Sequence, residues 1–152
     1  MVLIVGVLTT LSTVAYQRYV YRARFESVRS DLLVLLKKTL IILSSRGICG
    51  SDSVDPTSAK YSISLTDHKY LSSYRIKTIP DRSGCLVAGV FKSASDSNNS
   101  IFSDKTIMLM SKNITGSRFM SVDCITDIPN SYVFDPANMK CIYDDDVASK
   151  LV

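Results

Sequence analysis

The first 15 residues of the chain carry no charge, and at Ala15–Tyr19 this run passes into a charged segment without a Gly or Pro break. This continuity predicts a single helix from Val2 to about Ser45, with Gly47 turning the chain out of it in a left-handed conformation. At 1.5 Å per residue, the helix would be on the order of 65 Å long, about twice the thickness of a bilayer core. This long helix is the element that most constrains the fold of the remaining residues.

The two halves of the predicted helix suit different surroundings. In the first half, apolar residues surround the helix axis, so lipid or neighbouring helices are the expected environment. In the second half, apolar residues recur at steps of three and four, which predicts one face packed on a sheet. These residues are Phe25, Val28, Leu32, Leu35, Leu36, Leu40 and Leu43. The basic residues expected to remain in water are Arg22, Arg29, Lys37 and Lys38.

Length and charge limit the domain organisation. A chain of 152 residues accommodates one domain plus a protruding helix. The net charge of +4 is uneven, with seven basic and two acidic residues before Cys49, and 11 basic and 12 acidic residues after it. The nearly neutral second part argues against extensive binding to nucleic acid, which depends on phosphate contacts.

Four cysteines are widely spaced and include no CxxC pair: Cys49, Cys85, Cys124 and Cys141. Because the chain also has only 1 histidine, the pattern disfavours a metal site, and we predict no metal or other cofactor. An even number of cysteines behind an apolar N-terminal segment predicts two disulfides formed in an oxidising compartment. Three pairings are open. Cys49–Cys85 with Cys124–Cys141 is favoured, because each pair closes a loop of low regularity and stabilises by roughly 3 kcal/mol.

The region after the helix changes in composition. Residues 47–84 are rich in Ser, Asp, Pro and Thr and predict a connecting region with one short helix or strand. Strands are predicted at Cys85–Ala94, Lys105–Lys112 and Arg118–Ile125, and Thr115-Gly116 suits a tight hairpin. The expected fold class is therefore α+β, with a long N-terminal helix against an antiparallel sheet of three to four strands.

The segment between the last two cysteines is expected to be a loop. Pro129 and Pro136 exclude a central strand there. The residues that follow, 142–152, include the acidic run Asp144-Asp145-Asp146, which lacks the alternate spacing and the turn glycine of a calcium loop. We expect a solvated acidic tail.

His68, in Thr66-Asp67-His68-Lys69, raises the question of catalysis. No Ser or Cys nucleophile motif accompanies it, and adjacent residues rarely orient one another suitably. We therefore expect a surface histidine and a protein that is not an enzyme.

The N-terminal stretch MVLIVGVLTTLSTVAYQRYVYRAR resembles the first helix of type IV pilins. That family runs through an apolar block with a glycine to an Ala-Tyr-Gln-x-Tyr boundary. The residues that match are Gly6, Ala15, Tyr16, Gln17 and Tyr19. A second resemblance joins Gly116–Cys124, Ile125–Tyr132 and Cys141, which are similar to the disulfide-bounded loop of type IVa pilins. Between Cys49 and Gly116 the chain matches the family in layout only.

The chain also departs from the family pattern. Val14 stands where pilins usually carry a helix-kinking proline. The sequence begins with Met1 inside the apolar block, so the basic leader, the glycine cleavage point and the acidic residue near the mature N-terminus are not in it. We expect that the first residues of the mature family protein are missing from this sequence.

The resemblance implies a non-enzymatic structural subunit of a bacterial type IV pilus. Residues 1–24 would be the membrane anchor and filament core, and residues 25–152 the globular head, with its sheet at 85–125 and its disulfide loop at 124–141. Implied partners are other pilin subunits, the inner membrane, the prepilin peptidase and the pilus assembly machinery. The fibre would be extracellular and would serve adhesion to a host surface, twitching motility or DNA uptake. The residues implied in anchoring and assembly are Met1, Val2, Leu3, Ile4, Val5, Gly6, Val7, Leu8, Leu11, Val14, Ala15, Tyr16 and Tyr19.

Several alternatives are open at this stage. A minor or competence pilin that binds DNA would use a local basic cluster, for which Arg75, Lys77 and Arg82 are the candidates. A type II secretion pseudopilin shares the N-terminal helix, but the Cys124–Cys141 loop favours the pilus branch. A plain signal anchor is a further alternative, but it would not require the Ala-Tyr-Gln-x-Tyr boundary, which favours filament packing. A membrane-anchored enzyme has no nucleophile, metal or cofactor motif to support it.

Overall fold

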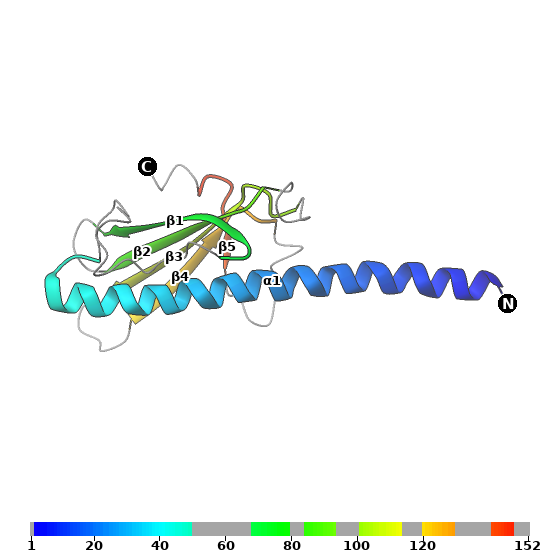
Figure 1. Cartoon of the computed structure of the whole chain (residues 1–152), viewed down its shortest axis with the longest axis horizontal. Coiled ribbons are helices and arrows are strands. Elements are labelled where there is room, and N and C mark those ends of the chain that lie inside the picture. The colour runs from blue at the N-terminus through cyan, green and yellow to red at the C-terminus, as the bar shows by residue number, and fades with distance from the viewer. Residues whose placement is uncertain are drawn as a thin grey trace.

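The computed structural model describes residues 2–49, 68–79, 84–93, 101–113, 120–129 and 141–147. In these residues the chain forms one helix, α1 (Val2–Arg46), and five strands. The strands are β1 (Leu71–Thr78), β2 (Cys85–Phe91), β3 (Thr106–Asn113), β4 (Met120–Thr126) and β5 (Ile142–Tyr143). The second half of α1 lies along the sheet, and its first half extends well beyond it (Figure 1). The predicted α+β class is confirmed.

The helix follows the sequence prediction closely. α1 is uninterrupted from Val2 to Arg46. Gly47 has a φ of 74°, and its N–H donates to the carbonyl of Leu43 at 2.8 Å. Because glycine adopts this left-handed conformation without a Cβ clash, Gly47 ends the helix as predicted.

The sheet has the order β1-β2-β3-β4-β5. The first four strands form an antiparallel meander, whereas β5 pairs with β4 in parallel. The predicted strands at 85–94, 105–112 and 118–125 correspond to β2, β3 and β4. The Thr115-Gly116 hairpin lies outside the described residues, although β3 and β4 pair as a hairpin requires, up to Asn113 and Met120.

The sheet is larger than the three to four antiparallel strands expected from the sequence. β1 occupies part of the predicted connecting region 47–84, and β5 lies in the predicted tail 142–152. β5 forms because Cys141 is bonded to Cys124, which brings the next residue, Ile142, alongside Ile125. The covalent link therefore sets the parallel register of a strand too short to be recognised by its sequence.

The main core lies between α1 and the sheet. Phe25, Val28, Leu32, Leu35 and Leu36 of α1 are buried, and Leu40 and Leu43 are partly buried against the same cluster, as the apolar periodicity predicts. From the sheet, the alternate residues of β2 and β3 that face α1 complete the core: Val87, Phe91, Ile107 and Leu109. A second, smaller cluster on the opposite face of the sheet contains Leu86, Ala88, Met108 and Val147.

Candidate functional site

The packed part of α1 ends near Tyr21. The ring of Tyr21 contacts that of Phe102 edge-on, with ring centroids 5.8 Å apart, and Phe102 in turn stacks on Phe91 at 5.2 Å. N-terminal to this aromatic group, residues 15–19 are all exposed. Tyr16 and Tyr19 are 68% and 71% exposed, so two large rings project into water where α1 leaves the sheet.

Apolar side chains also lie on the face of α1 that points away from the sheet. Val34 is 50% exposed and Ile41 is 69% exposed. Because they are seven residues apart, they lie on the same side of the helix, out of phase with the buried residues Leu32, Leu36 and Thr39. Single exposed apolar side chains are common on protein surfaces, so Val34 and Ile41 mark a candidate contact face only together with the other exposed apolar residues of the helix.

We define the exposed α1 surface as Tyr16, Tyr19, Val34 and Ile41. Tyr16 and Tyr19 were among the assembly residues predicted from the sequence, whereas Val34 and Ile41 were not. The available signal was their spacing of seven, which places two apolar residues outside the core stripe.

Basic residues flank this exposed α1 surface. Arg18, Arg22, Lys37 and Lys38 are exposed, in agreement with the prediction for the last three. Arg29 differs from its prediction, because its side chain is only 19% exposed and its guanidinium pairs with Glu26 at 3.1 Å. The i,i+3 spacing of these two residues brings them together on the helix.

The remaining predicted assembly residues are placed by the backbone of α1. Val2, Leu3, Ile4, Val5, Gly6, Val7, Leu8, Leu11, Val14 and Ala15 all belong to the helix, and Met1 lies outside the described residues. Their role in assembly stays a prediction. In the part of the chain that the structure describes, no helix combines the length and the hydrophobicity needed to cross a bilayer.

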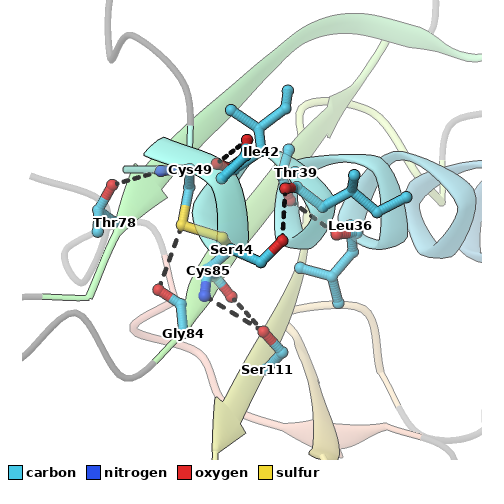
Figure 2. Close-up of a disulfide and its surroundings, with 11 residues drawn as sticks. Leu36, Thr39, Ile42, Ser44, Cys49, Thr78, Gly84, Cys85 and Ser111 are labelled. Atoms are coloured by element: carbon cyan, nitrogen blue, oxygen red, sulfur yellow. Dashed lines mark hydrogen bonds between the residues drawn. A yellow bond between two sulfur atoms is a disulfide. The ribbon is translucent and has the colours of Figure 1, made fainter. Parts of the chain in front are cut away.

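The two disulfides are Cys49–Cys85 and Cys124–Cys141, which confirms the favoured pairing. The first ties the end of α1 to the start of β2 (Figure 2). The N–H of Cys49 donates to Thr78 Oγ1 at 3.0 Å, and the N–H of Cys85 donates to Ser111 Oγ at 3.2 Å. These bonds connect α1, β1, β2 and β3 at one end of the sheet.

Close backbone packing accompanies this disulfide. A Cβ on Gly84 would lie 1.7 Å from the carbonyl oxygen of Ser111, so only glycine fits at this position. Cys49 Sγ lies 3.3 Å from the carbonyl oxygen of Gly84. Because a disulfide sulfur has no proton, this is a packing contact, which leaves the Gly84 carbonyl to accept the N–H of Ile79 at 3.1 Å.

The candidate DNA contacts are only partly placed. Arg75 and Lys77 are exposed on β1. They pair in register with Ala88 and Leu86, whose side chains belong to the cluster on the face opposite α1. Arg82 lies outside the described residues. DNA binding by this group stays a prediction.

His68 is not the surface histidine that the sequence suggested. Its side chain is 9% exposed, and its Nε2 lies 2.9 Å from a carboxylate oxygen of Asp31 on α1. The sequence could not reveal this contact, because the two residues are 37 positions apart. Asp67, the neighbour considered for a catalytic pair, lies outside the described residues. Among the described residues, no group of three or more His, Cys, Asp or Glu side chains could hold a metal ion.

Together these observations give the architecture of the protein. One half of a long helix packs on an α+β head, and a disulfide bounds the C-terminal region of that head. This arrangement is compatible with a pilin fold. No protein-family model matches the chain, and no curated protein matches it either.

Proposed function

We propose that this chain is a structural subunit of a bacterial type IV pilus that polymerises with copies of itself through α1. The observation that carries the proposal is the exposed α1 surface, which begins where the helix leaves the sheet. Tyr16 and Tyr19 are 68% and 71% exposed there, at the boundary that resembles the pilin Ala-Tyr-Gln-x-Tyr pattern. Burial of large aromatic side chains is a major source of association free energy.

The division of α1 into two halves supports a fibre in which the helices lie inside and the heads outside. The second half of α1 is fixed to the head by its buried face and by Cys49–Cys85. The first half extends beyond the sheet and is available to other subunits (Figure 1). A contact between two different surfaces on successive copies produces a closed ring if its rotation closes and an open helical polymer if it does not, and the proposed fibre is the second case.

The proposed pathway begins at the inner membrane and ends in the extracellular fibre. Its partners are the prepilin peptidase, the assembly machinery and further copies of the chain. Two disulfides support maturation in an oxidising compartment outside the cytoplasm. Adhesion, twitching motility and DNA uptake would be properties of the fibre, and the proposal includes no catalysed reaction.

The proposal can be tested with charged substitutions at matched exposed sites. Ile41 on α1 and Ile142 on β5 are 69% and 65% exposed, so Ile41→Asp and Ile142→Asp differ mainly in position. Tyr16→Asp provides a second change on the exposed α1 surface. All three heads should fold, because surface substitutions usually change stability by less than about 0.5 kcal/mol.

The expected difference lies in assembly. Tyr16→Asp and Ile41→Asp should lower the yield of sheared surface fibres by about tenfold or more, because an unpaired carboxylate would have to be buried between subunits. Ile142→Asp should assemble like the unchanged chain. Equal fibre yields from all three variants would remove the support for assembly through α1.

A further inference from the structure

Within the described residues, His68 makes three polar contacts that join the start of β1 to α1. Its Nε2 lies 2.9 Å from Asp31 Oδ2 on α1. Its Nδ1 accepts the backbone N–H groups of Tyr70 and Leu71, each at 3.2 Å. The imidazole therefore contacts the helix through one ring nitrogen and the first residues of the strand through the other.

These contacts determine which form of the imidazole fits. Two N–H donors point at Nδ1, so this nitrogen has to carry a lone pair, and the ring proton belongs on Nε2, where the Asp31 carboxylate accepts it. A doubly protonated ring would keep its bond to Asp31. It would also bring an N–H on Nδ1 against two backbone N–H groups, which then lose their acceptor.

The charged and titratable groups around the ring come from both elements. Asp31 belongs to α1, and the ring of Tyr70 meets the imidazole edge-on at 6.2 Å. Two cations lie over the Tyr70 ring, Arg24 at 5.9 Å and Lys69 at 5.5 Å. Lys92, the first residue after β2, also contacts this region, because its N–H donates to the carbonyl of Tyr70 at 2.9 Å.

We propose that His68 is a pH-sensitive latch, which in its neutral form fastens the start of β1 to α1 and on protonation releases the N–H groups of Tyr70 and Leu71. The latch closes at neutral pH and opens as the pH falls. It acts where β1 is weakest, because β1 is an edge strand and its pairing with β2 is irregular between Leu71 and Ser73.

The composition of the chain makes this latch easy to observe. His68 is the only histidine in the sequence. Histidine is the only side chain whose unperturbed titration falls between pH 5 and 8. A reversible change confined to the start of β1 in this pH range is therefore attributable to His68. The inference does not depend on the proposed function.

The test is amide hydrogen exchange on the full chain with both disulfides intact, at pH 8 and at pH 5, with each rate corrected for its intrinsic pH dependence. Protection at Tyr70 and Leu71 should fall about tenfold at pH 5, since two hydrogen bonds of modest strength are lost. Protection in β2 and β3 should not change. Imidazole ¹⁵N shifts at pH 8 should show Nδ1 without a proton.

Two variants separate the latch from a purely structural role. In His68→Asn, the side-chain oxygen can accept the same two N–H groups as in an Asx turn, but it does not titrate. Its protection at Tyr70 and Leu71 should be equal at both pH values. In Asp31→Asn, the amide oxygen can still accept the Nε2 proton, so Nδ1 should keep both N–H groups and their protection at pH 8 should be unchanged.

Three results would overturn the proposal. One is a proton on Nδ1 at pH 8 in the unchanged chain. Another is equal protection of Tyr70 and Leu71 at both pH values. The third is a fall in protection at pH 5 that persists in His68→Asn, because the change would then arise from another group.

Discussion

Thr126 is the residue that connects the last three strands. It is fully buried, and its Oγ1 donates to the carbonyl of Thr106 at 2.8 Å and accepts the N–H of Ile128 at 3.2 Å. Its own carbonyl accepts the N–H of Asp144 at 2.9 Å, just after β5. The next residue, Asp127, accepts the N–H of Thr106 at 2.7 Å through its carboxylate. One Thr-Asp pair therefore satisfies backbone groups on both sides of β4.

Replacing the Thr126 hydroxyl should lower the free energy of unfolding even when the new side chain has the same volume. Thr126→Val removes the acceptor of the Ile128 N–H and leaves the Thr106 carbonyl with the N–H of Asp127 at 3.3 Å, so we expect a loss of about 1–3 kcal/mol in the free energy of unfolding. Thr126→Ser keeps the hydroxyl and loses one methyl group, so it should be the less destabilised variant. Urea unfolding of both variants measures the difference. A Val variant as stable as the unchanged chain would show that the hydroxyl bonds contribute nothing.

At the level of elements, α1 and the three central strands could be predicted because their signals are local. The buried residues of α1 recur at helical spacing, and β2 is buried at nearly every position, as an apolar run indicates. Gly47 marks the end of α1 in the same way. These signals depend on a few consecutive residues and need no knowledge of the rest of the fold.

The elements that the sequence did not place depend on distant partners. β1, LSSYRIKT, lies in the region where one short helix or strand was predicted, but its few apolar residues do not determine its type or its bounds. β5 has only 2 residues and pairs through the register that Cys124–Cys141 imposes. The contact between His68 and Asp31 is likewise formed by the packing of β1 beside α1, which no local pattern encodes.

The two disulfides act on different elements, and their removal should separate the effects. Cys49–Cys85 closes a separation of 36 residues and Cys124–Cys141 one of 17. The chain-entropy relation gives a loss of roughly 4 kcal/mol for Cys49→Ala with Cys85→Ala, and roughly 3 kcal/mol for Cys124→Ala with Cys141→Ala. Urea unfolding measures both values.

The two double variants are distinguished more clearly by which segment loses protection from hydrogen exchange than by the loss of stability. Hydrogen exchange should accelerate near the end of α1 in the first double variant and at Ile142 and Tyr143 in the second, because those are the segments that each bond holds. If both variants loosen the same segment, the assignment of one disulfide to α1 and the other to β5 is wrong.

The whole molecule consists of a head and a helix that extends beyond it. The head combines a core on each face of the sheet with two disulfides. Tyr16 and Tyr19 mark the exposed part of α1 next to the head. The sequence suggested this division through its uncharged N-terminal run. Val34 and Ile41, which were not among the predicted assembly residues, extend the exposed apolar surface along the packed half of the helix.

The most direct test of the central claim is cryo-electron microscopy of surface fibres sheared from cells that produce this chain. We predict fibres built throughout from this subunit, with the α1 helices at the centre, Tyr16 and Tyr19 buried between copies, and the sheet facing outward. Fibres made of another subunit, or a fibre centre that contains no α1 helix, would contradict the account.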